Sequence, residues 1–146
     1  MMVYNSKSID ETKEFAKKVA NKISIGSVIA LIGDLGTGKT TFTQGFANEI
    51  GIKERVGSPT FKLVSEYKGF NYFLYHIDAY RLKGVNEFLN IGGEDYLNQS
   101  DGITIIEWAD IIAELLGPNT IIINFSRLYN KPNKRKIKIE GMQFEN

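Results

Sequence analysis

The first apolar pattern in the chain has the spacing of a helix. Phe15, Val19 and Ile23 are four residues apart, so they share one helical face. Ser8 precedes that pattern, and Glu11 follows Ser8 by three residues, which is the spacing of a capping box. The sequence therefore predicts a helix that begins just after Ser8 and packs one side against a core.

A buried strand and a second helix follow. Residues 27–32 form a short, largely β-branched apolar run, which predicts a buried strand. Helical spacing returns after Lys39, and Gly51 is placed to end that helix. Three apolar residues are predicted to face inward from it: Phe42, Phe46 and Ile50. A glycine-rich segment connects the strand to the helix.

The rest of the chain alternates between strand and helix patterns. Strands are predicted at residues 61–67, 71–78, 103–107, 120–126 and 135–140. Helices are predicted at residues 86–89 and 94–97, and after Glu107 as far as Leu116, where Gly117-Pro118 ends the pattern. This order predicts an α/β fold: a three-layer domain with a mixed central sheet and a C-terminal antiparallel hairpin.

Composition narrows the class of protein. The 146 residues are expected to form one domain, residues 1–146, and they contain no cysteine, which excludes disulfides and thiolate metal sites. His76 is the only histidine, so a histidine cluster is excluded as well. The apolar runs are too short to span a bilayer, and the first residues lack the order of a secretory signal. We expect a cytoplasmic protein with no membrane association.

The charge is nearly balanced, at +1, but five basic residues crowd together near the C-terminus. They are Lys131, Lys134, Arg135, Lys136 and Lys138. The simpler interpretation is a solvated turn between the last two strands. A contact for RNA or for an acidic partner is the alternative.

The glycine-rich segment matches the phosphate-binding pattern G-x-x-x-x-G-K-[ST] in full. Such a loop turns backbone N–H groups toward the phosphates, and the helix after it adds its positive N-terminal end. Lys39 is expected to reach the β- and γ-phosphates of ATP, and the Thr40 hydroxyl to bind Mg²⁺. The predicted nucleotide-binding residues are Gly33, Asp34, Leu35, Gly36, Thr37, Gly38, Lys39, Thr40 and Thr41.

Two predicted strands end in a carboxylate. Glu107 closes the apolar strand 103–107, and Asp78 closes strand 71–78. The carboxyl ends of such strands form the sheet edge where ligands bind. We predict that Glu107 is the acid linked to the metal, because its strand is the more uniformly apolar. Asp78 would then orient the attacking water or support another residue, so the predicted catalytic residues are Lys39, Asp78 and Glu107.

Other residues allow two interpretations each. Ser58, Pro59 and Thr60 follow the second helix, where a hydroxyl would sense the γ-phosphate as in a switch loop, or would simply stabilise a turn. His76 and Arg81 flank Asp78, either as site residues or as structural ones.

Missing motifs exclude or weaken other P-loop classes. A regulatory GTPase would carry Asp-x-x-Gly and Asn-Lys-x-Asp, but residues 78–81 end in Arg and residues 130–133 end in Asn. A kinase usually has several arginines in a lid, whereas the four arginines here are scattered: Arg55, Arg81, Arg127 and Arg135. A small Mg²⁺-dependent ATPase that acts on another protein fits best. A small phosphotransferase and a non-hydrolysing module that holds RNA remain alternatives.

The ordered stretches GDLGTGKTTF, GSPTF with LVSEY, YHIDAYRL and IIEWAD resemble the TsaE family, formerly YjeE. The resemblance runs from about Ile9 to about Asn124. It implies a P-loop ATPase of bacterial tRNA threonylcarbamoyladenosine biosynthesis, which works with the TsaB–TsaD pair and reaches tRNA only through that complex. The family's ATP hydrolysis supports multiple turnovers, while TsaD performs the transfer beside the anticodon.

The resemblance also implies roles for individual residues. Residues 33–41 would bind ATP, with Thr40 and Glu107 at the Mg²⁺ and Asp78 as an acid needed for hydrolysis. Ser58, Pro59 and Thr60 would form the switch-like loop. The match weakens beyond Phe125, so it implies no role for the basic hairpin.

Overall fold

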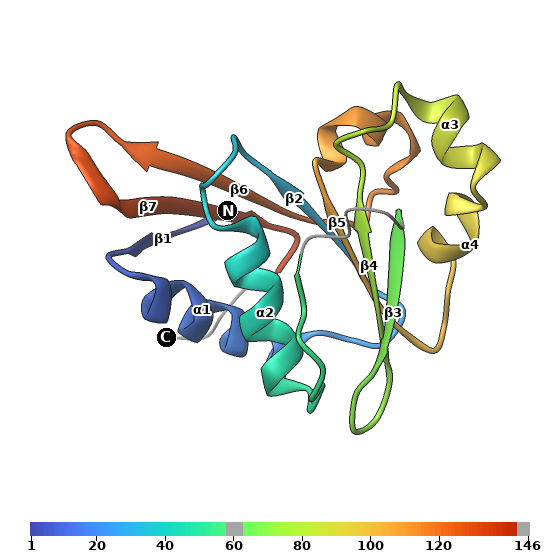
Figure 1. The fold of residues 1–146 in the computed structure, drawn as a ribbon, viewed down its shortest axis with the longest axis horizontal. Helices are drawn as coiled ribbons and strands as arrows, with labels where there is room; N and C mark the ends of the chain where they lie inside the picture. The colour runs from blue at the N-terminus through green and yellow to red at the C-terminus, as the bar shows by residue number, and fades with distance from the viewer. Residues whose placement is uncertain (58–62, 143–146) are drawn as a thin grey trace.

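The computed structural model describes residues 1–57 and 63–142, and within them a seven-stranded mixed sheet forms the centre of the molecule (Figure 1). The strands are β1 (Met2–Ser6), β2 (Val28–Ile32), β3 (Val64–Lys68), β4 (Phe73–Asp78), β5 (Gly102–Glu107), β6 (Ile121–Leu128) and β7 (Lys131–Glu140). Their order across the sheet is β1-β7-β6-β2-β5-β4-β3.

Parallel pairing holds the middle of the sheet together. Strand β2 lies parallel to both β5 and β6, and β4 lies parallel to β5. The edges are antiparallel: β6 and β7 form a hairpin, β1 pairs with β7, and β3 pairs with β4. The mixed sheet and the closing hairpin predicted from the sequence are both confirmed.

Helices cover both faces of this sheet. Helices α1 (Ile9–Lys22) and α2 (Lys39–Glu49) pack on one face, where Phe15 and Phe42 are fully buried. Helices α3 (Val85–Asn90) and α4 (Gly93–Leu97) and the 3₁₀-helix η1 (Ala109–Leu115) belong to the other face, where Phe88 and Ile112 are fully buried. The fold therefore has three layers and two cores, one on each side of the sheet.

The predicted ends of the first two helices are confirmed. The Ser8 hydroxyl accepts a hydrogen bond from the Glu11 N–H at 3.1 Å and caps α1. At the end of α2, the N–H groups of Gly51 and Ile52 donate to the carbonyls of Asn48 and Ala47 at 3.2 and 3.0 Å. These two bonds form a Schellman motif, which satisfies carbonyls that the helix leaves open.

Strand β1 is an element that the sequence pattern did not reveal. It is a five-residue edge strand whose first four side chains alternate between partly buried and exposed, and among the described strands it pairs only with β7. So short a segment has little periodicity of its own, and its strand conformation depends on a partner from the other end of the chain.

The segment after Glu107 also differs from the prediction. It is a 3₁₀-helix rather than an α-helix, with i→i+3 bonds from Ile111 to Trp108 at 3.1 Å and from Leu116 to Ala113 at 3.2 Å. Trp108 adopts a left-handed conformation (φ 58°), and Ile112 departs from helical geometry (φ −116°). The apolar spacing predicted the right buried face, but the sharp turn out of β5 at Trp108 does not start an α-helix.

The basic cluster near the C-terminus lies on a strand, which corrects the expectation of a solvated turn. Strand β7 begins at Lys131 and therefore includes all five basic residues. The hairpin connection is confined to Tyr129 and Asn130, and Asn130 has the positive φ (59°) that asparagine tolerates. No helix in the ranges described is both long and apolar enough to cross a bilayer.

Candidate functional site

The candidate site lies at the carboxyl ends of the central parallel strands. Strand β2 ends at Ile32, the glycine-rich loop follows, and α2 begins at Lys39. Asp78 and Glu107 are register partners on β4 and β5, so the two carboxylates end neighbouring strands at the same edge. Both acids therefore lie at the edge of the sheet from which the glycine-rich loop leaves, and their chemical roles stay predictions.

The loop between β2 and α2 is held in shape by close contacts. A Cβ at Gly33 would lie 2.6 Å from the carbonyl oxygen of Phe125, so only glycine fits where β6 passes. The Thr37 hydroxyl donates to the Asp34 carbonyl at 2.6 Å. Gly38 caps α2 without a side-chain hydrogen bond, which leaves the first N–H groups of this helix open to a ligand.

Lys39 is buried beneath the loop. Its ammonium donates to the carbonyls of Gly33 and Asp34 and lies 4.1 Å from the centre of the Trp108 ring. Burial lowers the pKa of Lys39, and the nearby carboxylates of Glu107 and Asp34 oppose that effect. The loop's own carbonyls are thus the hydrogen-bond acceptors of this cation.

Glu107 connects the loop helix to a buried histidine. One carboxylate oxygen, Oε1, accepts a hydrogen bond from the Thr40 hydroxyl at 3.0 Å. The other, Oε2, lies 2.5 Å from Nε2 of His76, which is fully buried on β4. His76 therefore fixes the orientation of the carboxylate and leaves Oε1 facing Thr40. The sequence left the role of His76 open, and the structure places it directly against Glu107.

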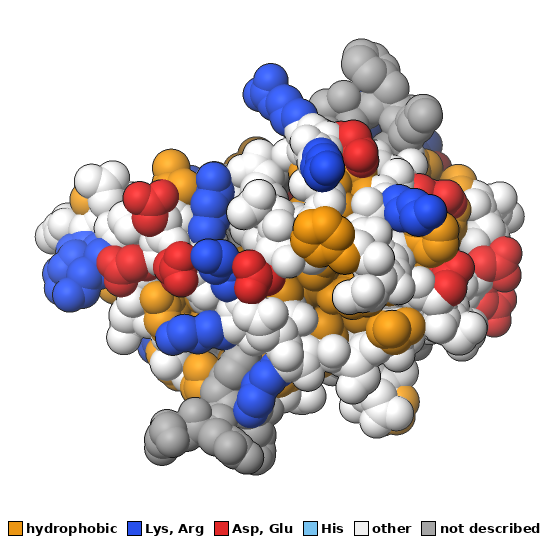
Figure 2. All heavy atoms as spheres, turned by 90° about the horizontal axis from the view of Figure 1, so that it is seen from below, with side chains coloured by type: hydrophobic (Ala, Val, Ile, Leu, Met, Phe, Trp, Pro, Cys, Tyr) orange, Lys and Arg blue, Asp and Glu red, His pale blue; other side chains and the backbone are white. Residues whose placement is uncertain are grey.

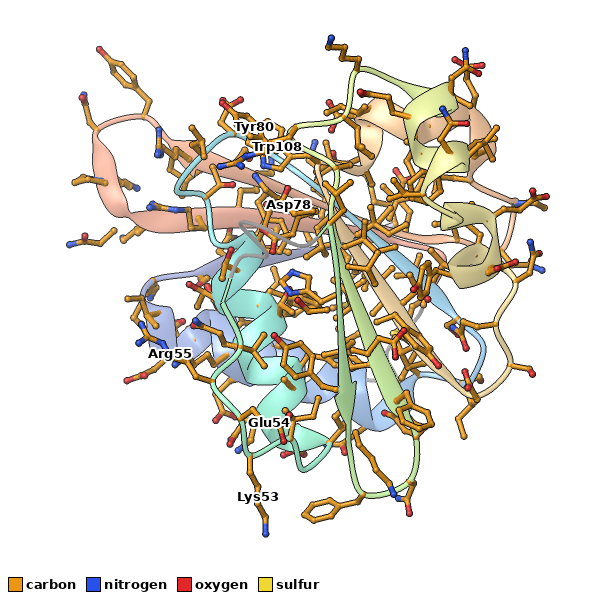
Figure 3. All side chains as sticks on the ribbon, turned by 45° about the vertical axis from the view of Figure 1, so that its right-hand side comes forward. Lys53, Glu54, Arg55, Asp78, Tyr80 and Trp108 are labelled. Carbon is orange, nitrogen blue, oxygen red and sulfur yellow. The ribbon has the colours of Figure 1, made fainter. Side chains whose placement is uncertain are left out.

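Asp78 lies beside two aromatic rings. Its carboxylate accepts a hydrogen bond from the Tyr80 N–H at 3.0 Å, and the Tyr80 ring lies 4.9 Å from that of Trp108. Figure 3 shows these three residues together at one end of the sheet, with the charged segment 53–55 well away from them. Strand β4 ends at Asp78, so Tyr80 lies just beyond the strand.

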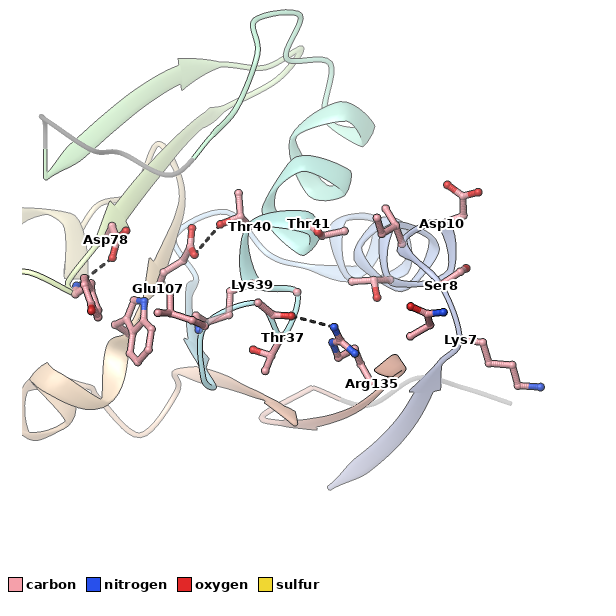
Figure 4. Close-up of a pocket in the computed structure, with 18 of the residues that line it drawn as sticks. Lys7, Ser8, Asp10, Thr37, Lys39, Thr40, Thr41, Asp78, Glu107 and Arg135 are labelled. Atoms are coloured by element: carbon pink, nitrogen blue, oxygen red, sulfur yellow. Dashed lines mark hydrogen bonds between the residues drawn. The ribbon is translucent and has the colours of Figure 1, made fainter. Parts of the chain in front are cut away.

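These groups open into a cavity of about 980 Å³ (Figure 4). Its wall includes loop residues, both acids and a segment before and within the start of α1: Lys7, Ser8, Ile9 and Asp10. That volume is large enough for a nucleotide-sized ligand. Seven of the nine predicted nucleotide-binding residues line it: Leu35, Gly36, Thr37, Gly38, Lys39, Thr40 and Thr41.

Sequence motifs left the role of Arg81 open and did not indicate Arg127 or Arg135 at this site. Arg81 and Arg135 line the cavity, and Arg127 donates to the Leu35 carbonyl at 2.5 Å. The four arginines are scattered in the sequence, but three of them meet at this site. The sequence of the hairpin did contain a signal for Arg135. It lies two residues before Ile137 on the same strand, so the two side chains share a face, and Ile137 belongs to the core beneath α1 and α2.

The predicted switch-like residues Ser58, Pro59 and Thr60 fall in residues 58–62, outside the part of the chain that the structure describes. Their role stays a prediction.

Comparisons with known proteins show which family the chain belongs to. The family described as "Threonylcarbamoyl adenosine biosynthesis protein TsaE" matches residues 6–137. A Bacillus subtilis protein named "tRNA threonylcarbamoyladenosine biosynthesis protein TsaE" is 38% identical over 136 residues, covering 93% of this chain and 84% of the relative. A Rickettsia prowazekii protein of the same name is 39% identical over 145 residues, covering 99% and 96% of the two chains.

A solved structure agrees with the sequence comparisons. The crystal structure of Bacillus subtilis YdiB superposes with a TM-score of 0.78 at 35% identity, covering 93% of this chain and 82% of the other. The match in fold covers nearly the whole chain. The chain therefore belongs to the TsaE family.

Proposed function

We propose that this chain is the Mg²⁺-dependent ATPase subunit required to form the threonylcarbamoyl group on the tRNA adenosine next to the anticodon. It acts in the cytoplasm with the TsaB–TsaD pair, permits multiple turnovers, and does not itself transfer the group. Its family and the names of its relatives support the pathway. The contact that carries the proposal is the 3.0 Å hydrogen bond between Thr40 and Glu107.

The site fits ATP in its backbone and its charge. The N–H groups at the start of α2 have no side-chain cap, and a buried ammonium, Lys39, lies beneath the loop. Phosphate oxygens would replace the carbonyls of Gly33 and Asp34 as acceptors for Lys39. Because burial has already removed water from the ammonium, its exchange of carbonyls for phosphate oxygens needs no further desolvation.

The oxygen donors of Thr40 and Glu107 fit Mg²⁺. A hydroxyl and a carboxylate oxygen from α2 and β5 meet here, and hard cations prefer oxygen ligands. Among the described residues, no group of three or more His, Asp or Glu side chains forms a metal cage. Mg²⁺ commonly binds through one or two protein groups plus phosphates, and it neutralises charge on the phosphates during transfer.

Three other side chains have separate roles in the proposed hydrolysis. Lys39 stabilises negative charge on the transferred phosphoryl group, and His76 holds Glu107 in position for the cation. Asp78 lies at the same sheet edge as Glu107 and accepts the Tyr80 N–H with one of its two oxygens. In this proposal its carboxylate orients the attacking water.

The proposal predicts slow phosphate release from ATP by the purified chain, and faster release when the TsaB–TsaD pair is added. We expect the increase because the partner binds and stabilises the reactive arrangement of the site. The measurement is phosphate release at saturating ATP, with and without the pair and with and without Mg²⁺. If ATP stays intact with pair and Mg²⁺ present, the proposed activity is wrong.

A small phosphotransferase is the second candidate, because Arg81 and Arg135 line the cavity where a lid would place arginines. The same experiment separates the two. Phosphate appears in water for an ATPase, and on an added nucleoside, sugar or acid for a phosphotransferase. The RNA-holding alternative has less support: Arg135 turns toward the loop, and Figure 2 shows basic and acidic side chains interspersed on the face it views.

A further inference from the structure

Two arginines of the C-terminal hairpin lie directly opposite each other. Arg127 on β6 and Arg135 on β7 are register partners, so their side chains share one face of the sheet. Like charges in directly opposed positions destabilise a strand pair. The described residues place no carboxylate in an ion pair with either guanidinium. The two opposed positive charges are therefore stabilised by other groups, which are backbone carbonyls of the loop between β2 and α2.

Both guanidiniums bind the phosphate loop through its backbone. Arg127 donates to the Leu35 carbonyl at 2.5 Å, and Arg135 donates to the Gly36 carbonyl at 3.0 Å, a bond drawn in Figure 4. A Cβ on Gly36 would lie 2.7 Å from Arg127 Nη2, so the guanidinium packs against the loop itself. Arg135 also donates hydrogen bonds to the carbonyls of Pro132 and Lys134, at 2.5 and 2.9 Å, which hold its guanidinium in place.

Binding these carbonyls also orients the N–H groups that follow them. In a trans peptide the C=O of one residue and the N–H of the next point in opposite directions. Holding the carbonyls of Leu35 and Gly36 therefore fixes the directions of the N–H groups of Gly36 and Thr37. In a phosphate loop these N–H groups are the ones that a phosphate uses.

Side-chain donors engage all four carbonyls from Gly33 to Gly36. Lys39 binds the first two, Arg127 the third and Arg135 the fourth. When Lys39 turns to the phosphates, its two bonds to the loop are lost. The two arginine bonds do not depend on Lys39, so they preserve the loop's shape at the moment when ligand binds.

We propose that Arg127 and Arg135 are positioning residues for the triphosphate. They orient the loop's N–H groups and add two positive charges at the rim of the phosphate site, and Arg135 faces the cavity directly. This inference deepens the proposed function and rests on it. The two arginines contact the loop, so the part of the ligand that they help to bind is the oligophosphate and not the base.

The test compares binding of ATP and of inorganic tripolyphosphate to the full chain. Arg127→Gln and Arg135→Gln keep a donor for the carbonyl but remove the charge and the planar fork. We expect each variant to lower the affinity for both ligands about tenfold, which is the usual effect of losing one hydrogen bond to a charged group. Arg→Lys variants keep the charge without the fork and should fall between Gln and wild type.

Lys136→Gln is the matched control. It removes one charge from the neighbouring position of β7, on the opposite face of the sheet, and should leave both affinities within about twofold of wild type. A purely structural role would lower the melting temperature of the Arg→Gln variants and leave both affinities unchanged. That result, or an equal loss in Lys136→Gln, overturns the inference.

The outcomes also separate this inference from the proposed function. Wild-type protein that binds tripolyphosphate in an arginine-dependent way but not ATP would support the arginine pair and contradict the ATPase. Tight ATP binding that is unchanged in both Arg→Gln variants would be consistent with the ATPase and would contradict the role of the arginine pair. Absence of binding to either ligand by wild type would overturn both.

Discussion

Replacing Glu107 by glutamine is expected to lower ATP hydrolysis roughly 100- to 1,000-fold, the range seen when one well-placed electrostatic group is removed from an active site. Glutamine has the same shape and keeps one oxygen near Thr40, but it loses the negative charge that favours a divalent cation. The Mg²⁺ concentration that gives half-maximal activity should rise in parallel. Because the shape is kept, the fold should remain intact.

Glu114→Gln is the control for this experiment. Glu114 is exposed on η1 and does not line the cavity, so its loss removes the same charge nearby without touching the site. We expect its activity and Mg²⁺ dependence to match wild type. Hydrolysis by Glu107→Gln at the wild-type rate, with unchanged Mg²⁺ dependence, would show that another group holds the metal.

Lys39→Ala is expected to lower kcat/KM for ATP by about 100-fold or more, since a buried ammonium directed at transferred phosphate contributes several kcal/mol. The protein itself should be as stable as wild type or more stable. Burial lowers the pKa of Lys39, which means that the folded environment disfavours its charge, and alanine removes that charge. Lost activity with a retained melting temperature is therefore the expected combination.

The matched control for Lys39→Ala is Lys53→Ala, which removes an exposed lysine in the segment that Figure 3 shows far from the site. Phosphate release and the melting temperature are measured on both variants. If Lys39→Ala lost activity only because it unfolded, its melting temperature would fall well below that of Lys53→Ala, and the assigned role would lack support.

The sequence predicts the parts of this site that are local. The loop and the start of α2 follow from one continuous motif, and the capping of α1 follows from Ser8 and Glu11 three residues apart. The meeting of Asp78 and Glu107 was also predictable, because parallel strands bring their carboxyl ends to one edge. In each case the residues that decide the structure are adjacent in sequence or end neighbouring strands.

The parts that were missed depend on pairing across the fold. The bond from His76 to Glu107 requires the register of β4 against β5, and the arginine pair requires the register of β6 against β7. Edge strand β1 forms on β7, and the 3₁₀ geometry after Trp108 follows from a left-handed residue that no apolar spacing indicates. Sequence periodicity identifies a buried face, but it does not set the register.

The measurement that tests the central claim most directly counts modified tRNA molecules per TsaB–TsaD pair, with the pair limiting and tRNA, ATP and the threonylcarbamoyl adenylate in excess. We predict repeated rounds of modification when this chain is present. Without the chain, or with Lys39→Ala in its place, modification should stop after a single round. The same number of rounds with and without the chain would contradict the account.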